Sequence, residues 1–276
     1  MMILNDADSR RLKELQIGIL KEFLHICGTH HFRYFFLGGS CLGAVRHQGF
    51  IPWDDDIDIG MPREDYERFL ETAEKELSFP YFLQTARTDP DYPLNFAKIR
   101  HTQTTFIESS VAHLQIHHGI YLDIFPLDGY SPSPLFQANL KRLKWGVEQA
   151  YHIREWRSGF KKLFVRACTC TLKDYRTARD HIEKAVRKRP YDSSDTVINY
   201  FGAWGKKELF PKEVFGEGSV GLFEGIEVML PADPDRYCRQ LYGNYMAYPP
   251  VEARVSHHHC DIIDLEKSYL EYRREQ

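Results

Sequence analysis

Four aspartates lie within five residues of this chain, in the run Asp54-Asp55-Asp56-Ile57-Asp58-Ile59. Carboxylates held this close repel one another, and leaving them together without a counter-ion is costly. Side chains on a β-strand alternate between its two faces, so Asp54, Asp56 and Asp58 are expected to share one face. The run therefore predicts a strand that carries an acidic trio. A solvated acidic turn at a strand end is the alternative interpretation.

The spacing along a strand limits which of these carboxylates can share one metal ion. Neighbours on one face lie about 6.6 Å apart, and the ends of the trio about 13 Å. Mg²⁺ holds its oxygen ligands at about 2.1 Å, so one ion bridges adjacent members but not both ends. We therefore predict that Asp56 and Asp58 form a metal pair for Mg²⁺, with Mn²⁺ as an alternative ion. Asp54 is predicted to hold a second ion or to position a substrate, which makes it a candidate catalytic residue.

A glycine-rich turn precedes the acidic run. The aromatic and aliphatic run from Tyr34 to Leu37 is typical of a strand, which Gly38 and Gly39 then end. Ser40 is predicted to be the N-cap of a short helix, Cys41–Arg46. Glycine lets the backbone approach a ligand closely, and the N–H groups at a helix start favour a phosphate. Gly38, Gly39 and Ser40 are therefore predicted to bind a phosphate.

A second apolar run, Gly119–Gly129, has the sequence Gly-Ile-Tyr-Leu-Asp-Ile-Phe-Pro-Leu-Asp-Gly. An aspartate inside an apolar strand is costly unless it binds a metal or is hydrogen-bonded. Asp123 is therefore predicted to be a third carboxylate of the site, either as a metal ligand or as the group that accepts a proton. Asp128 is predicted to belong to a turn closed by Gly129.

Two cations share one face of the predicted strand Phe96–Arg100. Alternation places Lys98 and Arg100 together on that face. Two cations on one strand face can contact the phosphates of a substrate. The alternative is a solvated strand face, and the residues alone leave both interpretations open.

Basic residues are concentrated in the middle of the chain. The whole chain of 276 residues has a net charge of −3, yet segment 137–190 holds fifteen Lys or Arg against five Asp or Glu. That segment therefore carries +10 and the remainder −13, which suggests attraction to an anionic partner. Aromatics at helical spacing predict a helical core subdomain with a solvated basic face. Peripheral membrane contact is the second interpretation, and nucleic acid is not expected as a partner because no recognition motif is present.

Composition and cysteine use are those of an ordinary globular protein, with 43% hydrophobic and 27% charged residues. No run approaches the roughly 18 uncharged apolar residues that a membrane helix needs. Charged residues among the first fourteen positions predict that no signal peptide is present. The six cysteines form no paired spacing, which predicts a reducing, cytoplasmic location, with peripheral contact at the inner face of the plasma membrane.

Four further segments complete the expected secondary structure. Asp8–Thr29 is predicted to be an amphipathic helix and Ser193–Trp204 a helix that starts at Ser193. Phe223–Pro231 is predicted to contain a hairpin, and Pro234–Tyr242 a short helix closed by Gly243. The run His257-His258-His259-Cys260 is not predicted to bind zinc, because successive residues of a regular element cannot all face one ion.

Strand, Gly-Gly-Ser, helix, and then Asp-hydrophobic-Asp-hydrophobic on the next strand resembles the nucleotidyltransferase-fold pattern. The run GGSCLGAVRHQGFIPWDDDIDIGM, followed by Asp65, Tyr66 and Phe69, closely resembles the LicD/fukutin family of that superfamily. The runs Lys98-Ile99-Arg100 with Thr104-Thr105 and Gly119–Gly129 are of the same type. One departure is Asn244, where an aspartate is usual in the family.

The resemblance implies an α+β fold, with a nucleotidyltransferase-like mixed β-sheet flanked by helices and a basic helical insertion. We expect a catalytic core over residues 1–133, the basic helical segment over 134–192, and a C-terminal part over 193–276 that packs back on the core.

The resemblance also implies an enzyme, a LicD-type phosphotransferase. Proteins of this type move a phospho-alcohol, typically phosphocholine from CDP-choline, onto a hydroxyl of a cell-surface glycan such as a teichoic-acid or lipopolysaccharide precursor. Fukutin-type relatives use CDP-ribitol. The expected partners are therefore a CDP-alcohol donor and a glycan or lipid-linked glycan acceptor. Mg²⁺ on the metal pair would face the diphosphate, and the expected substrate contacts include Arg46, His47, Lys98 and Arg100.

Two other functions remain open at this point. A nucleotidyltransferase that releases pyrophosphate needs the same metal geometry, so the acidic pattern does not separate it from a phosphotransferase. A catalytically silent protein could use the basic helices to bind membranes or glycans. It predicts that an Asp56→Asn/Asp58→Asn variant keeps all biological activity.

Overall fold

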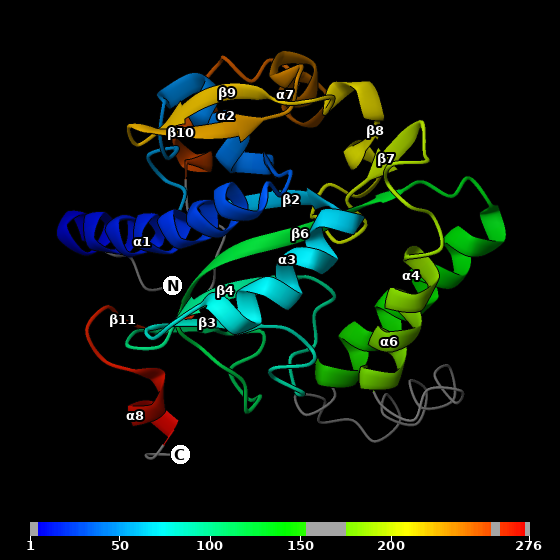
Figure 1. Ribbon diagram of the computed structural model, residues 1–276. Coiled ribbons are helices and arrows are strands. Elements are labelled where there is room, and N and C mark those ends of the chain that lie inside the picture. Colours follow the sequence, from blue (N-terminus) through cyan, green and yellow to red (C-terminus); the bar gives the residue numbers. More distant parts are fainter. Residues whose placement is uncertain (1–4, 153–174, 255–259, 274–276) are drawn as a thin grey trace.

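The computed structural model describes residues 5–152, 175–254 and 260–273, and the statements below concern these residues. Its centre is a mixed, seven-stranded sheet with helices packed around it, which confirms the predicted α+β class (Figure 1). The strand order is β1-β2-β6-β4-β3, with β7 attached to β6 and β8 to β7. These strands are β1 (Phe35–Phe36), β2 (Asp58–Pro62), β3 (Tyr81–Gln84), β4 (Ala97–His101), β6 (Ile120–Gly129), β7 (Thr196–Ile198) and β8 (Leu209–Pro211).

One pair in this sheet is parallel, and the pairs around it are antiparallel. β2 runs parallel to β6, while β4 pairs with the other edge of β6 in the antiparallel sense. All ten residues of β6 are buried, as expected for a central strand. This arrangement brings two segments that lie about sixty residues apart in the sequence next to each other.

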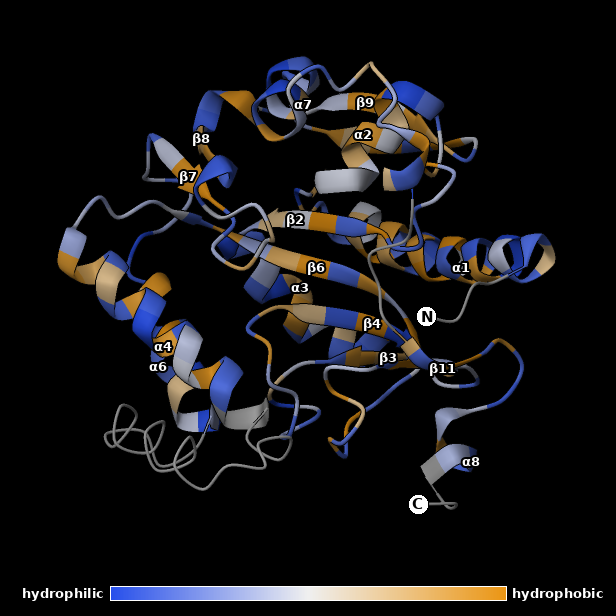
Figure 2. Cartoon of the chain, turned by 180° about the vertical axis from the view of Figure 1, so that it is seen from behind, coloured by the Kyte–Doolittle hydropathy of each residue, from blue (hydrophilic) through white to orange (hydrophobic). Residues whose placement is uncertain are grey.

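Two helices cover one face of the sheet. α1 (Asp6–His30) and α3 (Arg63–Glu76) lie in front of β6 and β4 in Figure 1, and both contact β6. The predicted apolar face of α1 is buried, including Leu12, Ile19 and Phe23. Figure 2, seen from behind, shows β2, β6 and β4 in front of α3. Burial of these apolar stripes drives the helices onto the sheet.

A second group of elements packs at one end of the sheet. α2 (Gly38–His47) contacts β9 (Ser219–Phe223) and α7 (Pro234–Tyr242), and β1 contacts β10 (Ile226–Leu230). The predicted hairpin is formed by β9 and β10. The prediction of α7 is also confirmed, and Gly243 ends this helix with a φ of 68°.

The basic middle segment contains a helix pair with its own core. α4 (Pro134–His152) packs on α6 (Tyr175–Val186). Their shared apolar side chains are Leu140, Leu143, Val147, Ala178, Ile182 and Val186. In the described part of this segment, the two helices thus pack through apolar side chains. Residues 153–174 lie outside the described residues, together with Cys168, Cys170 and the aromatics from Trp156 to Phe164.

The predicted helix Ser193–Trp204 is wrong. Residues Thr196–Ile198 form the short strand β7, which pairs with both β6 and β8. The β-branched run Thr-Val-Ile suits a strand, and pairing on two edges outweighs the local helix-start signal at Ser193. A turn then leads into the 3₁₀ helix η2 (Gly205–Glu208).

The remaining elements are short. β5 (Thr105–Glu108) pairs with β11 (Cys260–Asp264), and α8 (Tyr269–Arg273) follows. The 3₁₀ helices η3 (Lys212–Val214) and η4 (Val251–Ala253) connect neighbouring elements. His257, His258 and His259 lie outside the described residues. Within the described ranges, every helix is too short or too polar to cross a lipid bilayer.

Candidate active site

Three charged residues form one row across the central sheet. Asp58 of β2 pairs with Asp123 of β6, and Asp123 pairs in turn with Lys98 of β4. Neighbouring strands lie about 4.8 Å apart, so residues in one row are direct neighbours. The structure therefore places Asp123 beside Asp58 and not on the far side of the sheet.

The acidic run itself is not a continuous strand, so the predicted alternation of Asp54, Asp56 and Asp58 is wrong. Only Asp58 belongs to β2, and residues 54–57 approach the strand as irregular backbone. The Asp123 N–H donates to the Ile57 carbonyl at 2.9 Å, which joins this segment to β6 before β2 begins. Carboxylate oxygens of Asp54, Asp55 and Asp56 lie within 4.8 Å of one another, closer than strand alternation allows.

The glycine pair makes room for two of these carboxylates. A Cβ atom on Gly39 would clash with Asp54 Oδ2, and one on Gly38 would lie 3.1 Å from Asp58 Oδ2. Gly38 also has a φ of 49°, which favours glycine. The turn therefore needs both glycines for packing against the acidic run.

Ser40 is not the helix N-cap that the sequence predicted. α2 already begins at Gly38, and its N-cap residue Leu37 makes no side-chain capping bond. The Ser40 hydroxyl accepts a hydrogen bond from the Asp58 N–H at 2.9 Å and is 3% exposed. Ser40 thus ties α2 to the start of β2.

A cavity of about 320 Å³ opens above the row of charged residues. The described residues that line it include five carboxylates and one lysine, so its charge is strongly negative. Asp54 is not among the lining residues. The polar ones and the glycines are Gly38, Gly39, Asp56, Asp58, Lys98, Glu108, Asp123, Asn199, Gly202 and Glu208.

Lys98 and Asp123 form a buried ion pair in this cavity. Lys98 Nζ lies 2.9 Å from Asp123 Oδ1, donates to Oδ2 at 3.2 Å, and lies 3.8 Å from Glu108 Oε2. The ammonium also lies 3.4 Å from the centre of the Tyr121 ring. Burial raises the pKa of Asp123, Lys98 opposes that shift, and Glu108 and Asp56 add to it.

The donor set of the cavity suits a hard divalent cation. Carboxylate oxygens from two neighbouring strands are ligands that Mg²⁺ prefers. Asp123 Oδ1 is buried, and its neighbour among the described residues is the Lys98 ammonium at 2.9 Å. Asp56, Asp58 and Asp123 line the same cavity, whereas the three carboxylates whose oxygens lie within 4.8 Å of one another among the described residues are Asp54, Asp55 and Asp56.

Arg46 and His47, two predicted substrate contacts, lie at the other end of α2. Arg46 Nη1 donates to the Tyr245 carbonyl at 2.6 Å, and its Nε donates to His47 Nε2 at 2.9 Å. The Tyr248 ring contacts both side chains. Neither residue lines the cavity. Both residues lie at the C-terminal end of α2, where the helix dipole favours the positive charge of Arg46.

The Arg100 side chain does not line the cavity but packs against Tyr121, which does. Its side chain is fully buried, and it donates to Gln84 Oε1 at 2.7 Å and to the Gly119 carbonyl at 2.8 Å. Its guanidinium lies 4.7 Å from the centre of the Tyr121 ring, the ring that Lys98 also contacts. Lys98 and Arg100 thus share a face as predicted, but Lys98 alone of the two lines the cavity.

Three polar residues of the cavity were not predicted from the sequence. Glu108 lies at the end of β5, and Asn199 and Glu208 lie at the two ends of the segment that forms the opposite wall. Asn199 Oδ1 accepts from the N–H groups of Phe201 and Gly202, at 3.0 and 3.1 Å. Each is a single polar residue without a local pattern, so no sequence signal distinguishes it.

Glu208 is the most unusual of these three residues. Its side chain is 5% exposed, and it accepts a hydrogen bond from the Trp204 N–H at 2.9 Å. Burial raises its pKa to about 7. The Glu208 carboxyl therefore changes its charge near neutral pH, and its side chain forms part of one wall of the cavity.

Asp128 does not belong to a turn, contrary to the prediction. It is the penultimate residue of β6, pairs with Ile198 of β7, and is fully buried. Arg63 at the start of α3 binds both of its oxygens, at 2.8 and 2.7 Å. A buried carboxylate is tolerated here because a bidentate guanidinium neutralises it.

Comparison of the sequence with known proteins shows what this chain is similar to. Residues 31–134 match the domain described as LicD/FKTN/FKRP, nucleotidyltransferase domain. The lipopolysaccharide cholinephosphotransferase LicD of Haemophilus influenzae is 28% identical over 264 residues, which cover 90% of this chain and 96% of that protein.

Two further relatives match shorter stretches. An uncharacterised protein of Rickettsia prowazekii is 31% identical over 138 residues, 48% of this chain and 47% of that protein. The ribitol 5-phosphate transferase FKRP of Mus musculus is 58% identical over 33 residues, 12% of this chain and 7% of that protein. Residues 31–134 are therefore similar to the nucleotidyltransferase domain of the LicD/FKTN/FKRP family, and most of the chain is similar to a LicD protein.

Proposed function

We propose that this protein is a Mg²⁺-dependent phosphotransferase that moves phosphocholine from CDP-choline onto a hydroxyl of a glycan acceptor, such as a lipopolysaccharide or teichoic-acid precursor. The similarity over nearly the full length of a lipopolysaccharide cholinephosphotransferase supports the reaction class. The row formed by Asp58, Asp123 and Lys98 inside one cavity is the structural observation that carries the proposal.

The charge of the cavity supports the metal requirement. A nucleoside diphosphate would meet five carboxylates and one lysine among the described lining residues, and these charges repel it. Asp56, Asp58 and Asp123 would hold the Mg²⁺. The bound ion supplies positive charge to the diphosphate and to the departing CMP.

The start of α2 offers a second contact for the donor. The Gly38 N–H donates to the Tyr237 hydroxyl at 3.0 Å, whereas the N–H groups of Gly39 and Ser40 make no hydrogen bond within the described residues. Gly39 lines the cavity. The Gly39 N–H therefore suits a phosphate oxygen at the positive end of the helix dipole.

Asp123 has two roles in the proposal that one measurement separates. As a metal ligand, it completes the shell of Asp56 and Asp58. As a general base, it accepts the proton of the attacking hydroxyl. An Asp123→Asn variant that loses both Mn²⁺ affinity and turnover identifies a ligand, and one that loses turnover alone identifies the base.

Product analysis tests the proposed reaction directly. The purified protein is incubated with Mg²⁺, a glycan acceptor extract and, in separate reactions, CDP-choline, CDP-ribitol or CDP-glycerol. We expect CMP release with CDP-choline, and no release after EDTA treatment until Mg²⁺ or Mn²⁺ is restored. Pyrophosphate release from CTP and phosphocholine, with no CMP from any CDP-alcohol, would instead identify a nucleotidyltransferase.

The same variants test the silent-binding alternative. An Asp56→Asn/Asp58→Asn protein should lose CMP release and fail to restore phosphocholine on the glycan in cells that lack the wild-type protein. Full restoration by this variant would identify a binding protein.

The proposal includes peripheral contact with the inner face of the membrane through segment 137–190. The exposed cations of α4 and α6 support this contact, among them Lys141, Arg142 and Lys184. Leu135 near the start of α4 is 81% exposed, which adds an apolar side chain next to these cations.

A further inference from the structure

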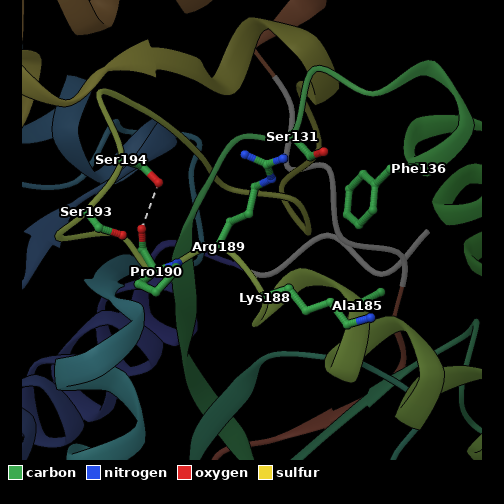
Figure 3. Close-up of a pocket in the computed structure, with 8 residues that line it drawn as sticks. All are labelled: Ser131, Phe136, Ala185, Lys188, Arg189, Pro190, Ser193 and Ser194. Atoms are coloured by element: carbon green, nitrogen blue, oxygen red, sulfur yellow. Dashed lines mark hydrogen bonds between the residues drawn. The ribbon is translucent and has the colours of Figure 1, made fainter.

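A second cavity, of about 400 Å³, lies near the start of α4 and the end of α6 (Figure 3). Two cations, three hydroxyls and one aromatic ring line it, and no carboxylate is among its described lining residues. Its charge is thus opposite to that of the candidate active site, which five carboxylates and one lysine line. The six side chains are Ser131, Phe136, Lys188, Arg189, Ser193 and Ser194.

The two cations of this cavity differ from the arginines around them. Arg187 pairs with Glu67 and Glu183, and Arg63 pairs with Asp128. By contrast, the side chains of Lys188 and Arg189 make no hydrogen bond or ion pair with any described residue. Both follow the last residue of α6, where the helix dipole favours a cation but does not require two.

The hydroxyl groups complete a polar wall. Ser131 is 3% exposed, its N–H donates to the Tyr200 hydroxyl, and its own hydroxyl makes no hydrogen bond with a described residue. Ser194 donates its proton to the Pro190 carbonyl at 2.8 Å, so Ser131 and Ser193 are the hydroxyls that can donate to a ligand here. Figure 3 shows the Arg189 side chain extending towards Ser131, with the Phe136 ring nearby.

This chemistry identifies the class of ligand. Paired cations with hydroxyl donors bind phosphate oxygens through charge-assisted hydrogen bonds. A volume of about 400 Å³ exceeds the needs of phosphate alone, and an aromatic wall suits the apolar face of a sugar ring. A phosphorylated sugar therefore fits both the charge and the size of this cavity.

The position of the cavity indicates which substrate carries that phosphate. Tyr200 contacts Ser131, and its ring lies edge-on to the Phe136 ring with the centroids 6.0 Å apart, while its neighbours Asn199 and Phe201 line the candidate active site. The segment around Tyr200 thus separates the two cavities. Asp123 lines the active-site cavity, and Gly129 lies beside Ser194 and Arg189 of the second cavity. These two residues are six positions apart on β6, which corresponds to about 20 Å. Such a span matches a chain of several sugars.

We propose that this cavity binds a phosphate group on the acceptor glycan, at a distance from the hydroxyl that reacts. The identification of the ligand as the acceptor glycan rests on the proposed function. The presence of a phosphate site does not depend on it. Phosphate on a sugar and phosphate in a lipid headgroup share this chemistry, and the experiment below distinguishes them.

Direct binding tests the site without any enzymatic activity. Glucose 6-phosphate is titrated by calorimetry into the full-length protein in EDTA, so that the active-site cavity keeps its negative charge. We expect binding that weakens about tenfold or more in Lys188→Ala/Arg189→Ala and more modestly in Ser131→Ala. Glucose itself should bind at least about tenfold more weakly than its phosphate.

The control removes the same charge elsewhere on the helix pair. Lys141→Ala/Arg142→Ala deletes two exposed, adjacent cations of α4 that do not line the cavity, and it should leave glucose 6-phosphate binding within about twofold. Equal affinity of the wild-type and Lys188→Ala/Arg189→Ala proteins overturns the site. Undetectable binding to the wild type overturns it as well.

Vesicles of phosphatidylcholine with phosphatidylglycerol test the lipid source. We expect the Lys188→Ala/Arg189→Ala variant to sediment with these vesicles as the wild type does. A variant that loses vesicle binding but keeps its affinity for glucose 6-phosphate would show a lipid contact and overturn the proposal.

Kinetics then connect the site with the reaction. If CMP release is observed, Lys188→Ala/Arg189→Ala should raise KM for the acceptor about tenfold and leave KM for CDP-choline and kcat unchanged. An unchanged acceptor KM would overturn the assignment to the acceptor. If no CDP-alcohol gives CMP, the proposed function fails while the calorimetric result still decides the phosphate site.

Discussion

Asp58 and Asp123 stand opposite each other on β2 and β6, which are the two parallel strands at the centre of the sheet. Lys98 continues the same row on β4 and binds Asp123 at 2.9 Å. One carboxylate of the pair thus has a lysine partner, and the other faces Asp56 and the glycine turn within one cavity. Most of the charged groups that line this cavity are therefore negative.

The first prediction concerns the two carboxylates of the row. Asp58→Asn or Asp123→Asn should reduce CMP release at least about a hundredfold, because each removes a carboxylate of the proposed metal site. Without metal, Asp58→Asn should not lower the free energy of unfolding, since it removes repulsion among neighbouring carboxylates. Urea unfolding in EDTA and CMP assays in Mg²⁺ measure the two effects. Glu227→Gln on the exposed edge of β10 is the control and should alter neither. A large loss of stability in Asp58→Asn would indicate a structural role.

The second prediction concerns the buried ion pair. Lys98→Met should lower the free energy of unfolding by about 3–5 kcal/mol, because it leaves Asp123 buried without its partner. The double variant Lys98→Met/Asp123→Asn should recover much of that loss. Urea unfolding at pH 7 of the four proteins in this cycle gives the coupling energy. Additive effects of the two substitutions would show that the pair does not couple.

The third prediction concerns the glycine turn. In Gly39→Ala the new methyl group must displace the Asp54 carboxylate, the movable end of a side chain. We therefore expect a loss of turnover of about tenfold or more with a change in stability below about 1 kcal/mol. Gly28→Ala in α1 is the matched control, because a Cβ there meets nothing within 4 Å. It should keep full activity and raise stability slightly. Equal activity of both variants would contradict the close packing at Gly39.

The fourth prediction concerns pH. Burial raises the pKa of Glu208 to about 7 in the folded protein, above its ordinary value of 4.5. The native state therefore keeps a proton that the unfolded chain loses, and this contribution to stability is full below pH 4.5 and lost as the pH rises through 7. Glu208→Gln stays neutral and can still accept from the Trp204 N–H, so it should reduce the fall in stability between pH 5 and pH 8.

Between pH 5 and pH 8, the free energy of unfolding should fall by at most about 2–3 kcal/mol more in the wild type than in Glu208→Gln, since one pKa unit corresponds to about 1.4 kcal/mol. Urea unfolding of both proteins at pH 5, 6, 7 and 8 measures the difference in slope. Parallel pH profiles for the wild type and Glu208→Gln would contradict the raised pKa. Glu213→Gln, an ion-paired surface residue, provides the comparison for a carboxylate in solvent.

Local patterns in the sequence predicted much of the central region. The apolar stripe of α1, the strand around Asp123 and the hairpin of β9 and β10 each depend on residues close together in the chain. In such patterns, the spacing of the apolar residues along the chain shows which face of a helix or strand is buried. They could not place Ser40, because whether its hydroxyl caps a helix or binds the Asp58 N–H depends on where β2 lies.

The position of each predicted cation along its helix or strand determined whether its side chain reaches the cavity. Arg46 lies seven residues after Gly39 on the same helix, which corresponds to about 10 Å, so it points to the Tyr245 and Tyr248 region instead of the cavity. Arg100 lies two residues from Lys98 on one face of β4, yet Gln84 and the Gly119 carbonyl bind it below the cavity. Glu108 and Glu208 reach the cavity from segments a hundred residues apart and carry no pattern that marks them.

The amino-acid sequence by itself determined that negative charge accumulates beside a glycine turn, because the repulsion among Asp54, Asp55, Asp56 and Asp58 is set by their spacing. Only the tertiary structure decided which of these acids share a cavity with Asp123, and that Lys188 and Arg189 line a second cavity of opposite charge. The reason is physical. Helix and strand periodicity acts over a few residues, whereas strand pairing between β2 and β6 joins positions that are sixty-five residues apart.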